Sequence, residues 1–383
     1  MNFQNMQSTT GDSFTSLLLR HLYTEICLVV LTVLLYSYWS WRIREPNIPT
    51  INAYRWDVMR RKAHEAYNTN AKTLIARGFA KYNGPFRIIT TQESRIVLPS
   101  SYIDWVKNCK ELDHQALVHD DFFAGYPGFD GQAVVTNPDR ILIDVTRTKL
   151  SQNARSIQVM DQQLMEVLKD TWTENRDWHT LKWSEDTMSV ISRMSASVFV
   201  GPELASDPEW QNLTTSYTTN LFKAVGALRQ WPSFVRPVVH QFLPQTKICR
   251  EQVKLARVKI RAVLGKREHE RATAEANGDT DRKHEDAIIW FDEIAAGRPY
   301  DPAAAQLALA ISALHTTSEA FRQVLLDICL RPDLLEPMRE EIKTAITESG
   351  WTIAALAKMN LVDSVMKESQ RFKSAIGKCW FSS

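Results

Sequence analysis

Four consecutive polar side chains follow a strongly apolar stretch in the last third of the chain. His315, Thr316, Thr317 and Ser318 come directly after the mostly small and aliphatic residues of 303–314. In a buried helix, hydroxyl groups and an imidazole cost free energy unless they are paired. The cluster therefore either bonds back to its own helix or lines a wet cavity, and the residues alone favour the first alternative.

Two other clusters carry charged side chains that could bind each other or a metal ion. Glu368 and Arg371 are three residues apart, so in a helix they share a face and can form an ion pair. Such a pair is worth roughly a few tenths of a kcal/mol if it is exposed. His119, Asp120 and Asp121 have suitable groups for a metal, but no second cluster completes a site. The sequence therefore predicts a structural pair and no metal site.

The elements that must position these residues are predicted to be mainly helical. Asp301 can accept hydrogen bonds from the first amides of a helix, and Pro302 suits the first helical position because no donor is needed there. The apolar periodicity predicts helices over 155–172, 184–199, 245–264, 302–330, 334–348 and 352–371. Two β-branched runs, 86–90 and 93–98, predict a small hairpin, and the charged stretch 266–285 predicts an exposed connection.

A row of cations marks one face of the predicted helix 245–264. Steps of three and four residues place five of them on one stripe, namely Lys247, Arg250, Lys254, Arg257 and Arg261. The stripe could meet an anionic membrane surface or an acidic redox partner. A solvated face is the alternative that the residues favour.

An apolar segment at 22–41 predicts a transmembrane anchor. Only Glu25 carries a charge within it, and its length just reaches across a bilayer core of roughly 30 Å. Arg42 and Arg44 follow, so the positive-inside rule keeps the next domain in the cytosol. A cleaved signal peptide is the alternative, but no small-residue cleavage site is visible. The predicted divisions are a tail at 1–21, the anchor at 22–41, a proline-bearing linker at 42–54 and a globular domain at 55–383.

The composition is that of an ordinary globular protein. The chain has 383 residues, of which 44% are hydrophobic and 23% charged, and a formal net charge of +2. This charge creates no strong field for nucleic acid, so no nucleic-acid partner is predicted. The five cysteines are widely spread without a C-x-x-C pair, which argues against a disulfide scaffold or zinc site and for a reducing compartment.

Two motifs give the chain a resemblance to a known family. Ser-Ala-Leu-His-Thr-Thr at 312–317 and Glu-Ser-Gln-Arg at 368–371 resemble the central and penultimate helices of the cytochrome P450 (heme-thiolate monooxygenase) family. The His-Thr-Thr-Ser form is similar to members from fungal secondary metabolism, as are the stretches 122–131, 284–291 and 331–342. The resemblance covers most of the chain and implies a mainly α fold with small β hairpins, preceded by one transmembrane helix.

The resemblance also implies roles for the polar residues. Thr316 would face the bound oxygen and help deliver protons, Thr317 would support it, and His315 stands where the family usually has an acid. Arg147 falls where the family offers cations to the heme propionates. The Glu368–Arg371 pair would tie its helix to a later segment beneath the heme. The loop 122–131 would touch substrate.

The cofactor, partners and location follow from the same resemblance. The intact family binds heme and oxidises hydrophobic small molecules such as terpenoids or polyketides. It takes electrons from an NADPH-dependent reductase. Together with the anchor at 22–41, this implies a single-pass protein of the endoplasmic reticulum membrane whose main domain faces the cytosol.

The family's iron ligand is expected beyond the last residues of the sequence. The family takes a thiolate from a cysteine loop well downstream of its Glu-x-x-Arg motif, and only twelve residues follow Arg371. Cys379 has Phe372 seven residues before it, as the family loop does, but Ala375 and Phe381 stand where that loop has glycines. We therefore expect a truncated fold that lacks the C-terminal heme-binding segment and binds no heme securely. The alternative to an inactive monooxygenase is a non-catalytic, membrane-anchored remnant or interaction protein.

Overall fold

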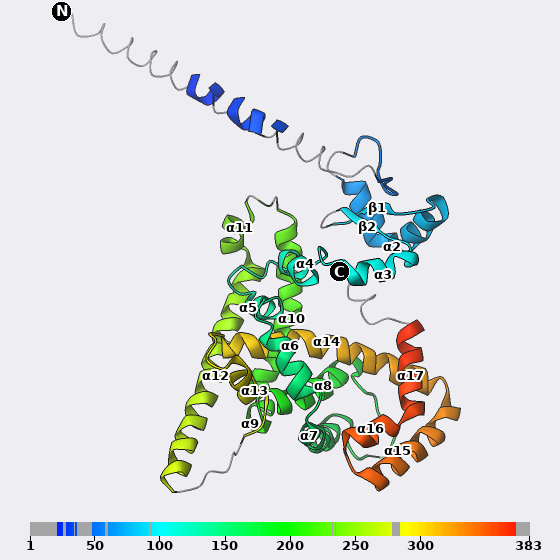
Figure 1. Cartoon of the computed structure of the whole chain (residues 1–383), viewed down its shortest axis with the longest axis vertical. Helices are drawn as coiled ribbons and strands as arrows, with labels where there is room; N and C mark the ends of the chain where they lie inside the picture. The colour runs from blue at the N-terminus through cyan, green and yellow to red at the C-terminus, as the bar shows by residue number, and fades with distance from the viewer. Residues whose placement is uncertain are drawn as a thin grey trace, which may run out of the picture. The chain divides into compact units, whose positions relative to one another are not determined.

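The computed structural model divides the chain into two units, Met1–Ile103 and Asp104–Ser383 (Figure 1). The structure describes residues 21–25, 28–33, 35–36, 48–57, 60–91, 94–175, 177–231, 233, 235–277 and 284–372. The predicted divisions at 21/22, 41/42 and 54/55 stay predictions.

The first unit is built around a short antiparallel hairpin and one helix. Helix α2 (Arg61–Lys81) precedes strands β1 (Phe86–Ile89) and β2 (Ser94–Val97). The strands pair with Phe86 opposite Val97 and Ile89 opposite Ser94, which confirms the predicted hairpin. The helix α2 was not predicted, because its apolar positions are too sparse to give a clear period.

One buried asparagine fastens the preceding segment to this hairpin. Asn52 is 1% exposed, and its side-chain nitrogen donates to the carbonyls of Ala63 and Ile89 at 3.1 and 2.8 Å. Its side-chain oxygen accepts from the Ile89 amide at 2.8 Å. The described end of the predicted linker therefore belongs to the hairpin.

The predicted anchor at 22–41 lies partly outside the described residues. Its described parts, within 21–25, 28–33 and 35–36, are helical. Within the part of the chain that the structure describes, no helix combines the length and apolar character needed to cross a membrane.

The second unit is mainly helical, as predicted, and its described residues form no strand. The turn η1 (Ser100–Tyr102) belongs to the end of the first unit, and the turns η2 (Thr146–Leu150) and η3 (Pro332–Leu334) lie between helices of the second. The helices from the boundary onward are α3 (Ile103–Asn108), α4 (His114–Asp121), α5 (Asp130–Val135), α6 (Ile141–Val145), α7 (Ala154–Trp172), α8 (Trp183–Phe199), α9 (Pro202–Ala205), α10 (Pro208–Arg229), α11 (Arg236–Phe242), α12 (Pro244–Ala276), α13 (Ala287–Ala295), α14 (Pro302–Cys329), α15 (Leu335–Ser349), α16 (Ile353–Lys358) and α17 (Asn360–Phe372).

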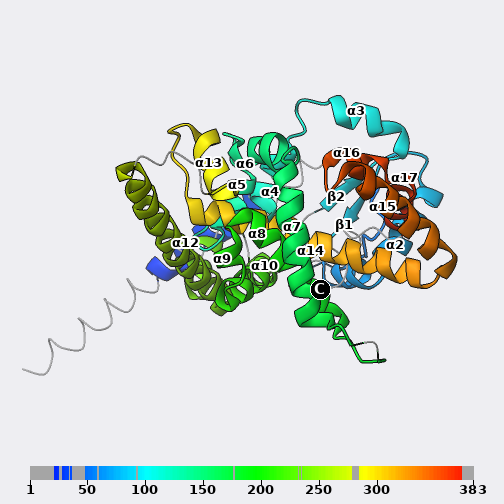
Figure 2. The same ribbon diagram turned by 90° about the horizontal axis from the view of Figure 1, so that it is seen from below.

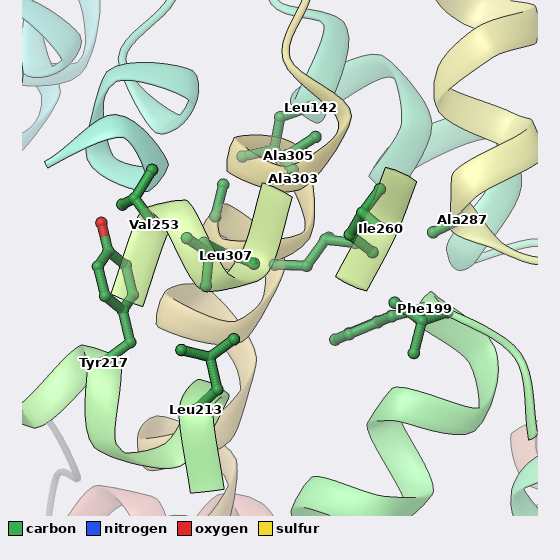
Figure 3. Packing of buried hydrophobic residues seen from close by; sticks show 14 of the residues in the cluster. Leu142, Phe199, Leu213, Tyr217, Val253, Ile260, Ala287, Ala303, Ala305 and Leu307 are labelled. Carbon is green, nitrogen blue, oxygen red and sulfur yellow. The ribbon is translucent and has the colours of Figure 1, made fainter. Parts of the chain in front are cut away.

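Helix α14 forms the centre of this unit. It packs against α5, α8, α10 and α12, and α17 lies against its C-terminal part (Figures 1 and 2). Leu307 of α14 lies among Leu213 and Tyr217 of α10 and Val253 of α12, and Ala305 lies beside Leu142 of α6 (Figure 3). The small residues allow close approach. A Cβ added to Gly131 of α5 would lie 3.1 Å from the Cβ of Leu307, so these two helices meet almost backbone to backbone.

The start of α14 is specified as the sequence predicts. The Asp301 side chain accepts from the amides of Ala303 and Ala304 at 3.0 and 3.3 Å, and Pro302 occupies the first turn. The Arg257 guanidinium donates to Asp301 at 2.8 Å and to Asp130 at 2.6 Å. The capping carboxylate is therefore also tied to α12 and α5.

The predicted cationic stripe on α12 is exposed at Lys247, Lys254 and Arg261, whereas Arg250 and Arg257 are half-buried and bonded within the fold. Arg257 lies between two carboxylates, and Arg250 donates to the carbonyls of His240 and Gln241, each at 3.0 Å. Helical spacing could not reveal these partners, because they come from other elements.

Two predicted helix boundaries also need correction. Helix α12 continues to Ala276, so the first half of the predicted connection at 266–285 is helical. The predicted helix 352–371 is broken at Met359, whose backbone is not helical. The second part, α17, begins where Glu341 accepts hydrogen bonds from the amides of Leu361 and Val362 at 2.8 and 3.1 Å. A carboxylate from α15 therefore caps this helix from outside its own sequence.

A salt bridge with almost no solvent contact stabilises the connection between α12 and α13. The side chains of Arg267 and Asp286 are 11% and 4% exposed, and one of their contacts measures 3.0 Å. Asp286 also accepts from the Ile288 amide at 3.1 Å. Removing one partner of such a pair leaves the other charge buried and uncompensated.

We expect Asp286→Ala to lower the free energy of unfolding by about 3 kcal/mol, because it leaves Arg267 buried without its partner and removes a helix cap. Urea unfolding of the full chain measures this. Asp333→Ala is the matched control, because it breaks the exposed pair with Arg331 and should change stability little. Equal effects of the two substitutions would contradict the prediction.

Candidate functional site

The predicted polar cluster occupies one turn of α14 and is divided between two environments. Thr316 and Thr317 are exposed, whereas Ser318 and the preceding Leu314 are buried. The hydroxyl of Thr316 donates to the carbonyl of Ser312 at 2.8 Å, and that of Ser318 donates to Leu314 at 2.7 Å. Both hydroxyls thus bond back to the helix, as the residues alone favoured.

The exposed face of this turn can still interact with another molecule. The Thr316 hydroxyl gives its proton to the helix but keeps lone pairs on an exposed oxygen. Ser312, one turn earlier, is exposed too and donates to the Ala308 carbonyl at 2.9 Å. This face therefore presents hydroxyl acceptors, beside the exposed side chain of Thr317.

His315 links α14 to α10. Its Nε2 lies 3.2 Å from the carbonyl oxygen of Thr215, so this nitrogen carries the proton and donates. Burial lowers the pKa of His315, the Thr215 carbonyl raises it, and the positive charge of Arg322 lowers it further. The imidazole is therefore neutral near pH 7.

Arg147 lies in the π-helical turn η2, directly after α6. Its side chain is exposed, and its carbonyl oxygen accepts from the Ser151 hydroxyl at 2.8 Å. The α6–η2 segment packs against α13. The proposed contact of Arg147 with heme propionates stays a prediction.

Glu368 and Arg371 form the ion pair that their spacing predicts. The guanidinium of Arg371 donates to both carboxylate oxygens of Glu368, at 2.7 and 2.8 Å. The side chains are 56% and 63% exposed, and the hydrogen bond from Arg371 lowers the pKa of Glu368. Their helix is held on α14 because the Ser369 hydroxyl donates to Asp327 at 2.5 Å.

The loop 122–131 is docked on three helices. The Tyr217 hydroxyl of α10 donates to the Gly128 carbonyl, and His240 of α11 donates to the Pro127 carbonyl, both at 2.9 Å. Gly128 has φ +94°, and a Cβ there would lie 2.9 Å from the Arg250 backbone nitrogen of α12. Phe129 is fully buried. The second half of this segment is therefore fixed within the fold, and its contact with substrate stays a prediction.

None of the described cysteines fits the thiolate ligand of a heme. Burial raises the pKa of Cys249 to about 12, which keeps it protonated in the core. Cys329 is exposed, but it lies thirteen positions after Thr316 in the same helix, which is about 20 Å along the axis. The Cys109 thiol is engaged in a hydrogen bond that it donates to the Glu111 carboxylate at 3.2 Å. Cys27 and Cys379 lie outside the described residues.

His119 and Asp120 lie close together without forming a larger ligand set. The Nδ1 of His119 is 3.3 Å from Asp120. Within the described ranges, no group of three His, Cys, Asp or Glu side chains could hold a metal ion.

The sequence of this chain is similar to those of known proteins. A family model described as Cytochrome P450 matches residues 140–378. The chain is 36% identical over 335 residues to "Cytochrome P450 monooxygenase ntnM" of Nectria sp, covering 87% of this chain and 63% of that protein. It is 33% identical over 350 residues to "Dihydromonacolin L monooxygenase mokC" of Monascus pilosus, covering 91% and 66%. The chain spans slightly less than two thirds of the length of these relatives.

One solved structure supports the fold. The chain matches "Retinoic acid bound cyanobacterial CYP120A1" with a TM-score of 0.54 and 14% identity, over 85% of this chain and 69% of that one. The likeness is one of fold alone.

The half-buried, neutral His315 should make stability depend on pH. Its pKa is lower in the folded chain than its ordinary value of 6.5, so below pH 6.5 the unfolded chain binds the proton more readily. Its contribution is present above pH 6.5 and is lost as the pH falls from 6.5 toward the folded pKa. We expect the free energy of unfolding of His315→Asn to fall less than that of the wild type between about pH 7.5 and pH 5.5.

Urea unfolding at the two pH values measures this difference. His179→Asn removes an exposed imidazole and serves as the control for the loss of a histidine. A pH dependence of His315→Asn identical to that of the wild type would contradict the assignment.

Proposed function

Because the chain belongs to the cytochrome P450 family, we propose that the protein is a heme-thiolate monooxygenase of fungal secondary metabolism. Its substrate is a hydrophobic small molecule, such as a terpenoid or polyketide, and its electrons come from an NADPH-dependent reductase. The observation that carries the proposal is the family match over 140–378, which includes the exposed turn of α14 with Thr316 and Thr317. Fungal relatives named as monooxygenases support the reaction class.

The site residues of this chain have binding and positioning roles in the proposed function. The exposed Thr316 hydroxyl accepts hydrogen bonds on the reaction side of α14, and Thr317 lies beside it. His315 orients α14 on α10 through Thr215 instead of serving as the usual acid. Arg147 is the cation offered to propionates, and the Glu368–Arg371 pair braces α17. The described cysteines do not fit the thiolate, so no reaction step is assigned through heme.

A second proposed function, that of a non-catalytic protein, is supported by the positions of the described cysteines. The described cysteines are buried and protonated, distant from Thr316, or beside a carboxylate. A polypeptide of these 383 residues is then a non-catalytic remnant or interaction protein that takes up no heme through a thiolate. The sequence spacing around Cys379 supports the same conclusion.

We expect the polypeptide of residues 1–383 to give no thiolate-type Soret band in a carbon monoxide difference spectrum, because its cysteines do not supply the ligand. A thiolate-type band would overturn the non-catalytic proposal for this polypeptide, and its loss in Cys379→Ser would identify the ligand.

The monooxygenase proposal has a separate test in the genomic sequence. An active monooxygenase of this family needs its thiolate loop, so its gene should encode Phe-x-x-Gly-x-x-x-Cys-x-Gly in a frame after the Arg371 codon. A chain extended through that frame should give the thiolate-type band. The absence of any such frame would count against the proposal.

We further propose that the protein is a single-pass protein of the endoplasmic reticulum membrane, with its main domain in the cytosol. The support is the sequence of 22–41, which has one charged residue and two arginines after it. Deletion of residues 1–41 is expected to move the protein from the carbonate-resistant membrane fraction to the soluble or aggregated fraction. Retention of the shortened protein in the membrane fraction would contradict an anchor at this position.

A further inference from the structure

A small cavity lies inside the second unit, where α8, α10 and α14 meet. Its lining consists of Ser192, Ala196 and Phe199 of α8, Trp210 and Thr214 of α10, and Gln306, Ala310 and Leu314 of α14. The volume open to the centre of a water-sized sphere is about 10 Å³. A volume of about 10 to 15 Å³ on this measure holds one water molecule.

The cavity lies on a different face of α14 from the predicted reaction side. Gln306, Ala310 and Leu314 are spaced four residues apart, so they form one stripe along the helix. Thr316 follows Leu314 by two residues, which is about 200° around the helix axis. The cavity is therefore independent of the function proposed for Thr316.

Gln306 places an amide with unmet hydrogen-bonding capacity in this cavity. Its side chain is 2% exposed, and neither its oxygen nor its nitrogen has a hydrogen-bond partner within the described residues. An amide offers two donors on nitrogen and an acceptor on oxygen. Buried polar groups are almost always satisfied by protein or ordered water, because leaving them unpaired costs free energy.

The neighbouring hydroxyls offer acceptors but no spare donors. The Ser192 hydroxyl donates to Gln211, and the Thr214 hydroxyl donates to the Trp210 carbonyl at 3.0 Å. Gln211 is occupied further by a 2.6 Å bond to the Ala205 carbonyl. The oxygens of Ser192 and Thr214 therefore keep lone pairs that only a donor can use.

The chemistry of the lining selects the ligand. No lining residue carries a charge, so the cavity favours a neutral molecule over an ion. The ligand must accept from the Gln306 nitrogen and donate to the Gln306 oxygen or to a hydroxyl oxygen. A water molecule has two donors and two acceptors and matches the available volume.

We propose that this cavity is a binding site for one structural water molecule, held by the Gln306 amide and by a hydroxyl of Ser192 or Thr214. The water joins α14 to α8 and α10 by hydrogen bonds where their side chains leave a gap. It thereby positions the central helix from the face that Thr316 does not use.

A crystal structure of the full chain, at a resolution that shows ordered water, tests the site directly. We expect a density peak within hydrogen-bonding distance of the Gln306 amide in the wild type. Gln306→Met keeps a similar length but removes the polar groups, so the peak should disappear. A dry cavity in the wild type, or a second rotamer that gives Gln306 a protein partner, would overturn the proposal.

Solution measurements provide a second readout. Relaxation dispersion of water oxygen-17 counts long-lived internal waters, and Gln306→Met should have one fewer than the wild type. Ser318→Ala is the matched control on the same helix, because Ser318 is buried but bonded to Leu314 and does not line the cavity. The double variant Ser192→Ala, Thr214→Val, which removes both hydroxyls, repeats the test should Gln306→Met not fold. Unchanged dispersion in a folded cavity variant would overturn the proposal.

Discussion

The close packing of one face of α14 is the constraint on which the second unit depends. The small side chains of its first half let neighbouring helices approach until Gly131 nearly meets the backbone of Leu307. Interiors of this density tolerate little change in volume, so the axis of α14 is set by the contacts along this half. The direction of this axis then decides where the side chains of the later turns of α14 lie.

Polar contacts then complete the placement at both ends of the helix. Asp301 caps the start and shares Arg257 with Asp130, so one cation connects the first turn to the start of α5. Near the other end, Asp327 accepts from Ser369 and holds α17 in place. The exposed turn at Thr316 and Thr317 lies between these two attachments, supported by His315 on α10.

The sequence could predict what depends on neighbouring residues and little of what depends on distant ones. The cap at Asp301, the hairpin pairing and the Glu368–Arg371 pair were all confirmed, since each is decided within a few positions. Helix α10 was missed although Asp207 and Pro208 give a clear start signal, because its apolar residues are interrupted by threonines. The partners of Arg257 and the break at Met359 come from other elements, where local periodicity carries no information.

The candidate site likewise has residues that the sequence identifies and contacts that only the structure shows. Thr316 and Thr317 were identifiable from motif and setting, but the direction of His315 toward Thr215 and the unmet amide of Gln306 exist only in the packed structure. The central claim is that packing buries Ser318 and leaves Thr316 accessible on the same turn. Thiol modification rates of Thr316→Cys and Ser318→Cys, in a chain whose native cysteines are replaced, test it most directly. We predict that the thiol at position 316 is modified rapidly in the folded chain, whereas the thiol at position 318 reacts only when the chain unfolds. Equal protection of both thiols would contradict this prediction.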